Sequence, residues 1–454
     1  MGNCCKRNKK TKPVTFDNSQ TTNNSNNDIS KMEMKDDNCK NEGIRFTNDY
    51  YGNNQNNGNN KDSMSTIKKK KDENSQRNHE TSDFSDNSEV SVNNNRYDKI
   101  LIGLNNIGAT CYMNATLQCL SNTKKLTEFF MNSFEKYYEK NDDKKITIEY
   151  YKLLKHLWDV KNKNNTPYSP DEFKEVISNE NPLFEGIQAN DSKDLINFLL
   201  EKMHEELNKA PKNNIFVNNN NVMKNPNIQM DKSKILQIFL ENFKNNYQSI
   251  ISDIFYGTSE TNYLCKSCGT VKYNYEIFFF LEFPLEQVNI YFGKAYNSNN
   301  YIRIKNNPDV DLLECFEYNK KEEYMTGENQ MYCNICEKNC DAVYSTSLFS
   351  MPKYLIIILN RGKGNVYQCN VNFPQTLDLS KYIVSKGGIS QYHLYAVICH
   401  LGPSSMSGHF IAFCRHRINE KWYKYNDDIV TECQGNEYLT GVPYILFYEE
   451  MEFL

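Results

Sequence analysis

Three residues far apart in the chain could together form a nucleophilic catalytic site. Cys111 stands just ahead of the apolar, helix-compatible run 115–120 and just behind a turn that contains Gly108. A thiolate at the start of a helix faces the positive end of the helix dipole, which lowers the pKa of a cysteine. His409 and Asn426 follow near the other end of the chain. A thiol nucleophile, an imidazole base and an orienting amide, in that order, predict nucleophilic thiol catalysis.

The segments around these residues resemble the Cys and His boxes of the ubiquitin-specific proteases. They are 103–114, 407–412 and 422–428, and the resemblance extends over residues 102–449. A lone cysteine before a helix is more often a buried structural thiol, but two long boxes in the right order favour catalysis. The resemblance implies a papain-like α+β fold with thumb, palm and zinc-binding, β-rich fingers. It also implies hydrolysis of the (iso)peptide bond at the C-terminal glycine of ubiquitin through a thioester.

The resemblance gives each site residue a role. It implies that Cys111 attacks the carbonyl carbon and that His409 transfers the proton. Asn426 should orient the imidazole, and Asp427 is the alternative for that role, since the family has Asp or Asn there. Asn106 matches the family side chain that contributes to the oxyanion hole. The alternative for Asn106 is a purely turn-forming asparagine.

The clearest predicted helix carries apolar residues at every fourth position, namely Leu195, Leu199, Met203 and Leu207. Asp191 can cap its N-terminus. The resemblance implies that Asp191 and Asp194 bind the basic tail of ubiquitin, although Ala189 and Asn190 replace two glutamines of the family. Gly408 should let the backbone pass close to the scissile bond, so we expect a larger residue there to obstruct the site.

Two CxxC pairs predict a structural metal site. Cys265 and Cys268 form the first pair, and Cys333 and Cys336 form the second. Four thiolates suit tetrahedral Zn²⁺, and the short spacing lets both sulfurs of a pair point at one metal ion. The family resemblance implies that this zinc lies at the tip of the fingers. Cys340 is an alternative ligand, and free buried thiols are the alternative to a metal site.

Helical periodicity comes first along the chain and strand patterns come later, which indicates an α+β fold. Helices are predicted at 126–138 and 148–160, with a loop at 162–170. The Asn- and Lys-rich segment 208–246 predicts an insertion with one short helix at 235–243. Strands of a mainly antiparallel sheet are predicted at 270–285, 354–360, 392–401, 409–415 and 444–448.

The composition of the 454-residue chain divides it in two. Residues 1–97 are rich in Asn, Ser, Lys and Asp and predict a disordered tail. Residues 98–454 predict one catalytic domain, with the fingers at about 255–350. The formal net charge of -4 gives no reason to expect a nucleic-acid partner. We expect a monomer whose partners are ubiquitin and ubiquitinated proteins.

The extreme N-terminus carries a separate signal. Gly2 is a candidate for myristoylation, and Cys4 and Cys5 are candidates for palmitoylation, followed by several basic residues. Lys6 departs from the usual pattern, which prefers Ser or Thr. Acylation would attach the protein peripherally to a membrane. The fifteen cysteines are expected to be reduced. We therefore expect a cytoplasmic protein, anchored on the cytosolic face of a membrane if acylated, with the nucleus as the alternative.

Two other functions remain open from the sequence. A catalytically silent ubiquitin-binding scaffold would have lost a residue of the site, whereas Cys111, His409, Asn426 and Asn106 are all present. A protease for another ubiquitin-like modifier would keep all four, and the altered residues before Asp191 are compatible with it.

Overall fold

The computed structural model describes residues 101–136, 145–158, 166–211, 231–294, 309–362, 366–402, 408–417, 419–434, 436–439 and 442–452. Gly2, Cys4, Cys5 and the predicted disordered tail lie outside the described residues. Within the described ranges, none of the helices combines the length and apolar character needed to cross a membrane. The cysteines in these ranges are all free thiols.

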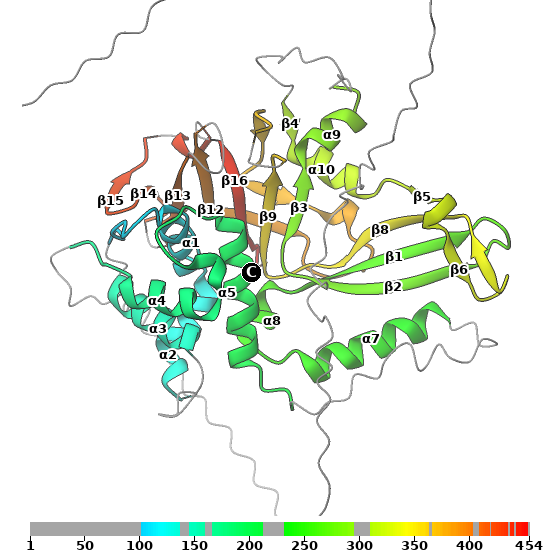
Figure 1. Cartoon of the computed structure of the whole chain (residues 1–454), viewed down its shortest axis with the longest axis horizontal. Coiled ribbons are helices and arrows are strands. Elements are labelled where there is room, and N and C mark those ends of the chain that lie inside the picture. Colours follow the sequence, from blue (N-terminus) through cyan, green and yellow to red (C-terminus); the bar gives the residue numbers. More distant parts are fainter. Residues whose placement is uncertain are drawn as a thin grey trace, which may run out of the picture. The chain divides into compact units, whose positions relative to one another are not determined.

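Most helices precede the main sheet along the chain (Figure 1). They are α1 (Cys111–Ser121), α2 (Lys124–Asn132), α3 (Lys145–Trp158), α4 (Asp171–Glu180), α5 (Ser192–Leu207), α7 (Lys232–Asn246) and α8 (Ile250–Phe255). α3 and α5 match predicted helices, whereas α2 covers only the first part of the predicted helix 126–138 and is followed by a 3-10 turn at Phe134–Lys136. The backbone N–H of Lys193 donates to Asp191 Oδ1 at 2.9 Å as the expected cap of α5. α4 escaped prediction because it buries only Phe173 and Ile177, which leaves little apolar periodicity.

The main sheet has eight strands, in the order β15-β14-β13-β12-β16-β9-β3, with β11 paired to β12. All neighbouring strands run antiparallel except β3 and β9. The strands are β3 (Leu281–Pro284), β9 (Tyr354–Asn360), β11 (Thr376–Asp378), β12 (Gln391–Leu401), β13 (His409–Arg415), β14 (Trp422–Asn426), β15 (Ile429–Glu432) and β16 (Pro443–Glu450). The predicted strands at 354–360 and 409–415 are confirmed residue for residue.

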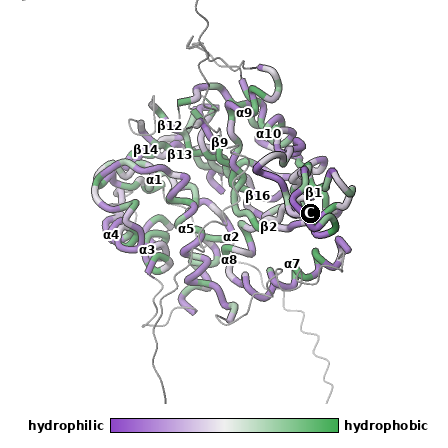
Figure 2. The backbone as a smooth tube through the Cα atoms, turned by 45° about the vertical axis from the view of Figure 1, so that its right-hand side comes forward, coloured by the Kyte–Doolittle hydropathy of each residue, from purple (hydrophilic) through white to green (hydrophobic). Residues whose placement is uncertain are grey.

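Both faces of this sheet are buried, each against a different set of helices. On β9, Ile356 and Ile358 pack in the core shared with α1, α5 and α8. The alternate residues Leu355 and Ile357 pack in a second core with α9 (Leu285–Tyr291) and α10 (Leu312–Asn319). Figure 2 shows the hydrophobic colour concentrated in the central strands. The helix-then-sheet order and the two buried faces are those of the predicted α+β fold, which is confirmed.

A smaller sheet forms the fingers. Its strand order is β2-β1-β8-β5, and a separate hairpin pairs β6 with β7. The strands are β1 (Gly257–Cys265), β2 (Val271–Phe278), β5 (Glu323–Met325), β6 (Met331–Cys333), β7 (Lys338–Cys340) and β8 (Ala342–Ser350). Short β4 (Val310–Asp311) pairs with β10 (Val371–Asn372) outside both sheets.

The expected boundaries of the fingers, about 255–350, need one correction. This range contains an insertion that includes β3, α9 and α10 and does not belong to the fingers, because β3 pairs with β9 of the main sheet and α9 and α10 pack in the second core. Leu285, Val288 and Leu312 of this insertion are fully buried in that core. The fingers therefore consist of two stretches on either side of this insertion.

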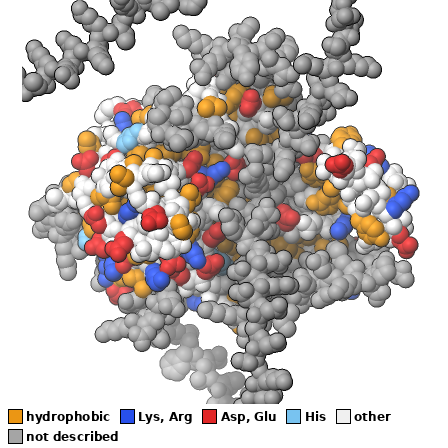
Figure 3. Space-filling view, viewed as in Figure 1, with side chains coloured by type: hydrophobic (Ala, Val, Ile, Leu, Met, Phe, Trp, Pro, Cys, Tyr) orange, Lys and Arg blue, Asp and Glu red, His pale blue; other side chains and the backbone are white. Residues whose placement is uncertain are grey.

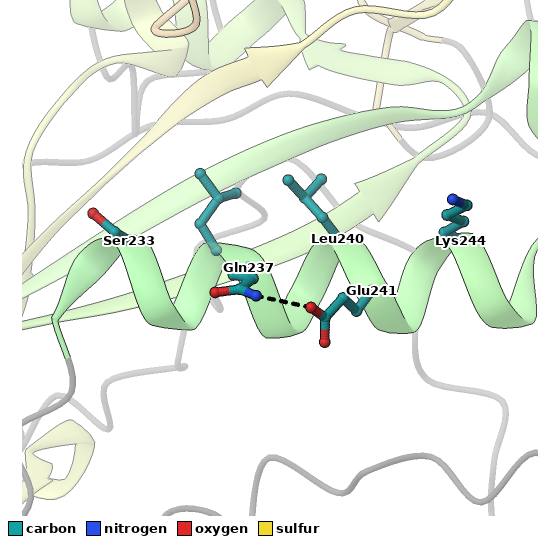
Figure 4. A pocket seen from close by; sticks show the side chains of 6 residues that line it. Ser233, Gln237, Leu240, Glu241 and Lys244 are labelled. Atoms are coloured by element: carbon teal, nitrogen blue, oxygen red, sulfur yellow. Dashed lines mark hydrogen bonds between the residues drawn. The ribbon is translucent and has the colours of Figure 1, made fainter.

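Helix α7 lies alongside the fingers and is longer than the predicted helix 235–243. Lys232 Nζ lies 2.7 Å from the buried Glu260 of β1, and the rings of Phe239 and Tyr275 lie 5.7 Å apart. A shallow hollow runs along another face of α7 (Figure 4), where Gln237 Nε2 donates to Glu241 at 2.9 Å. The residues described as lining it all come from α7, and none belongs to the sites described below.

Candidate active site

The loop before α1 fixes the candidate nucleophile. Cys111 is the first residue of α1 and is 5% exposed. The side-chain oxygen of Asn106 accepts the backbone N–H of Thr110 at 3.0 Å and that of Gly108 at 3.3 Å. Gly108 has a φ of 124°, which a residue with a side chain would rarely adopt. The loop therefore reaches the helix through a rigid turn and places the thiol at the positive end of the helix dipole.

His409 and Asn426 come from neighbouring strands. His409 begins β13, Asn426 ends β14, and His409 Nε2 lies 2.6 Å from Asn426 Oδ1. Because the asparagine oxygen can only accept, Nε2 carries the hydrogen and Nδ1 is the nitrogen available to Cys111. Contact with the Cys111 thiol is the largest influence and raises the pKa of His409 to about 9. Burial opposes this shift, and Asn426 and Asp427 reinforce it.

Asp427 does not occupy the position that orients the His409 imidazole. It lies in the turn between β14 and β15 with a φ of 51°, and its Oδ2 is 3.8 Å from His409 Nε2. Asn106 Nδ2 donates to Asp427 Oδ2 at 2.9 Å, and Asn114 Nδ2 donates to Asp427 Oδ1 at 2.9 Å. Asn426 is therefore the direct partner of the imidazole, while Asp427 binds the two amides on the Cys111 side.

Asn114 was not singled out from the sequence. It lies one helical turn after Cys111 and is almost fully buried, and it also donates to the carbonyls of Leu104 and Asn105. Asn114 is a polar residue in an otherwise apolar first helical turn, and this signal could have identified it. Residues spaced three apart lie on one helix face, so Asn114 lies on the face of Cys111.

Gly408 is required by packing inside the protein. A Cβ at Gly408 would lie 1.9 Å from Nε2 of His400, whose side chain is buried and packs on Phe410. Burial lowers the pKa of His400, so this imidazole is neutral at neutral pH. Gly408 therefore allows the strand that begins with His409 to lie directly against a second histidine. This requirement is separate from the expected contact of Gly408 with substrate.

The predicted tail-binding residues lie at the start of α5. Asp191 accepts the hydroxyl of Tyr444 at 2.8 and 2.9 Å in addition to capping the helix. Burial and the neighbouring Asp191 raise the pKa of Asp194. Glu282 of β3, which was not predicted, joins this acidic group and lies 3.2 Å from Lys193 Nζ. The sequence held no signal for Glu282, because the parallel pairing of β3 with β9 sets its position.

The four predicted metal ligands lie together at the tip of the fingers. Cys265 and Cys268 flank the end of β1, and Cys333 and Cys336 flank the end of β6. Their sulfur atoms all lie within 4.8 Å of one another, and those of Cys268 and Cys333 are 3.6 Å apart. Tetrahedral Zn²⁺ with bonds of about 2.3 Å separates its sulfur ligands by about 3.8 Å. The four cysteines can therefore hold a metal ion of this kind.

The contact between Gly408 and His400 gives a testable prediction. Gly408→Ala should destabilise the fold by about 1–3 kcal/mol, because the new methyl group overlaps a buried ring. His400→Ala should also be destabilising because it leaves a cavity. In the double variant the methyl group enters that cavity, so the loss should be smaller than the sum of the single losses by about 1–3 kcal/mol.

Urea unfolding measures the three free energies. Gly388→Ala is the matched control, because a Cβ there meets only Ser385 Oγ at 3.7 Å. Additive losses in the double variant would contradict the packing argument.

Comparisons with known proteins agree with this geometry. The family profile described as "Ubiquitin carboxyl-terminal hydrolase" matches residues 102–448. Human ubiquitin carboxyl-terminal hydrolase 2 is 29% identical over 361 residues, covering 77% of this chain and 55% of the relative. Human ubiquitin carboxyl-terminal hydrolase 21 is 26% identical over 368 residues, covering 77% and 62%. The Usp2 enzyme of Drosophila melanogaster is 28% identical over 356 residues, covering 77% and 35%.

The chain thus matches between about a third and three fifths of the length of these relatives. Among solved structures, the SAGA Ubp8/Sgf11/Sus1/Sgf73 DUB module bound to ubiquitin aldehyde is similar, with a TM-score of 0.55 and 20% identity. That match covers 78% of this chain and 70% of the other, and it shows the same fold. With the family profile matching most of the chain and the same fold in a solved relative, the chain belongs to the ubiquitin carboxyl-terminal hydrolase family.

Proposed function

We propose that the chain is a cysteine deubiquitinase that hydrolyses the (iso)peptide bond at the C-terminal glycine of ubiquitin. The observation that carries this proposal is the position of Cys111 at the start of α1, beside an imidazole fixed by Asn426 at 2.6 Å. Membership of the family supports it, as does the fold shared with a module whose structure contains ubiquitin aldehyde.

The reaction uses Cys111 and His409 in two steps. Cys111 Sγ attacks the glycine carbonyl carbon while its proton moves to His409 Nδ1. The tetrahedral intermediate collapses, the C–N bond breaks, and His409 gives the proton to the departing lysine amine. Water then attacks the thioester, with His409 as the base that accepts its proton. The C–S bond breaks, the proton returns to the thiol, and the ubiquitin carboxylate leaves.

Asn106 contributes a donor for the oxyanion. Its Nδ2 carries two hydrogens, and one is directed to Asp427 at 2.9 Å. The second hydrogen is available to the oxygen that becomes negative in the tetrahedral intermediate. Loss of one such donor typically slows the chemical step by about 10²–10³. The turn-forming and oxyanion-stabilising roles of Asn106 are compatible, because they use opposite ends of the amide.

The acidic group at the start of α5 fits a basic, extended peptide. Asp194 and Glu282 add to Asp191, and Lys193 offsets only part of their charge. Burial raises the pKa of Asp194, so an approaching cation would stabilise its charged form. Ubiquitin's tail is the ligand that family membership suggests for this surface. Glu282 is an additional acidic contact that we assign to it.

Zinc at the four cysteines would have a structural role. Four thiolates complete the coordination of Zn²⁺ and leave no open position for substrate. Bound metal would hold the β1–β2 hairpin to the β6–β7 hairpin, which the hydrogen bond from Lys266 N to Asp341 O at 2.9 Å already joins. The fingers would then be rigid enough to contact a folded ubiquitin.

The partners proposed are ubiquitin and ubiquitinated proteins, bound by a monomer. Nucleic acid is not among them, since acidic and basic side chains are interspersed over the helical part visible in Figure 3. The presence of Cys111, His409, Asn426 and Asn106 argues against the scaffold alternative. The alternative of another ubiquitin-like modifier rests on Ala189 and Asn190 and is an outcome of the first test below.

Labelling with a modified ubiquitin tests the proposal directly. The full chain should form one covalent adduct with ubiquitin that carries a thiol-reactive group at its C-terminus, and Cys111→Ala should abolish it. Intact mass and peptide mapping report the adduct. Cys433→Ala is the control, because Cys433 is a partly exposed thiol outside the site. Absence of an adduct from the folded protein would favour the scaffold, and an adduct with a related modifier alone would favour that modifier.

The alkaline limb of the pH–rate profile should report His409. The pKa of His409 is raised to about 9, so the imidazolium that protonates the leaving amine is present below that pH and is lost above it. Asn426→Ala removes a hydrogen bond that favours the charged form, so the fall in kcat/KM should begin at lower pH. Asp427→Asn should shift the limb in the same direction and also lower kcat, because Asn106 and Asn114 lose a charged acceptor.

A fluorogenic amide of ubiquitin measures kcat/KM for each variant across this pH range. Asp428→Asn is the matched control, since it changes a neighbouring carboxylate in the same turn. Limbs that coincide in all variants would show that His409 does not set the alkaline limb.

We also propose peripheral attachment of the protein to the cytosolic face of a membrane. The support is the sequence Met1-Gly2-Asn3-Cys4-Cys5 followed by basic residues. One myristoyl chain anchors only marginally, whereas a second acyl chain makes attachment stable. Intact mass of the protein purified from cells should show one myristoyl group, with thioester-linked palmitate on Cys4 or Cys5. Gly2→Ala should move the protein from the membrane fraction to the cytoplasm or nucleus, and an unmodified Gly2 would contradict the proposal.

A further inference from the structure

A fifth thiol lies against the four-cysteine cluster of the fingers. We propose that Cys340 is an alternative metal ligand that takes the place of Cys336 when the Cys336 thiolate is lost. This inference rests on the structural metal site proposed above. It adds that the site can keep four thiolate ligands without one of its CxxC residues.

The burial of Cys340 is explained by the cluster itself. Cys340 is 2% exposed and packs with Cys265 and Cys333, and the partly buried hydrophobic residues packed against them are Met331 and Cys336. A structural cysteine normally packs among aliphatic or aromatic side chains, as Cys399 does in the main sheet. Among the described residues, the apolar surroundings of Cys340 consist of sulfur-containing side chains.

The β6–β7 hairpin places Cys340 on the same side as a ligand. Met331 pairs with Cys340 and Cys333 pairs with Lys338, so Cys333 and Cys340 are diagonal neighbours on one face. Cys340 Sγ donates to the carbonyl oxygen of Lys338 at 3.6 Å. The Cys340 side chain is therefore directed at that carbonyl oxygen, and it stands outside the group of four sulfurs in the present arrangement. A cysteine has a single side-chain torsion to the sulfur, so one rotation could redirect Cys340 toward the cluster.

Cys336 is the ligand that Cys340 is placed to replace. Both residues belong to the β6–β7 hairpin, and Cys336 packs against the buried cluster that contains Cys340. Cys336 is partly exposed in the turn between β6 and β7, where oxidants and alkylating reagents can reach it. Cys268 is more exposed but belongs to the β1–β2 hairpin, across the cluster. Cys268 therefore provides a matched control, because it is an accessible ligand with no fifth thiol on its own hairpin.

Metal binding by serine variants of the full chain tests the proposal. Bound zinc is measured by elemental analysis, and Co²⁺ substitution reports the number of thiolates through the intensity of the sulfur-to-cobalt absorption. The unsubstituted chain, Cys340→Ser and Cys336→Ser should each hold one metal with four thiolates. Cys268→Ser and the double variant Cys336→Ser/Cys340→Ser should show three. They should also release metal to a chelator at least roughly tenfold faster, since loss of outer-shell partners alone costs about 10–100-fold in affinity.

Two results would overturn the proposal. In one, Cys336→Ser resembles Cys268→Ser, and adding Cys340→Ser has no further effect. In the other, Cys340→Ser alone loses the metal. An unsubstituted chain that binds no metal would refute the metal site and this inference together, while the test of catalysis with modified ubiquitin would stand independently.

Alkylation of the unsubstituted, zinc-loaded chain gives a second measurement if a serine variant fails to fold. Limited treatment with iodoacetamide should modify Cys336 while the metal is retained and Cys340 is protected, as mapped by peptide mass. Release of one zinc for each Cys336 alkylated would contradict the proposal.

Discussion

The hydrogen bonds of the Asp427 carboxylate join the two halves of the active site. One oxygen accepts from Asn106 in the loop before Cys111, and the other accepts from Asn114 on the first turn of α1. The backbone supports the same contact, because Leu104 N donates to Asp427 O at 2.9 Å. Hydrogen bonds to a charged group contribute about 1.5–3 kcal/mol each. The loop that carries the thiol is thereby fixed to the hairpin that ends beside the imidazole.

The residue that orients the imidazole is therefore not the residue that carries the nearby negative charge. The neutral amide of Asn426 fixes the imidazole at 2.6 Å, while the carboxylate of Asp427 lies farther away at 3.8 Å and accepts hydrogen bonds from two amides. Under the proposed function, the pKa of about 9 for His409 suits an imidazole that accepts the thiol proton and then protonates the leaving amine.

The sequence predicted those parts of the molecule whose signal is local. The strand 354–360 and the helix capped by Asp191 have strong periodicity, and the boxes around Cys111 and His409 are contiguous. β1 was missed because its Thr, Ser, Glu and Asn residues do not resemble a buried strand, although the fingers bury several of them. The distinct roles of Asn426 and Asp427 could not be predicted from two neighbouring positions in the sequence. They depend on a two-residue turn in which Asp427 adopts a positive φ and points away from its neighbour.

Contacts between distant segments account for the remaining differences. Gly408 is adjacent to His409 in sequence, yet its requirement arises from His400 on the neighbouring strand. Glu282 reaches the acidic group of α5 only because β3 runs parallel to β9, and Asn360 at the end of β9 donates to it at 2.7 Å. An acidic surface assembled from a helix and a strand in this way has a fixed spacing of charges. Under the proposed function, an extended basic peptide that passes this surface would meet carboxylates from both elements.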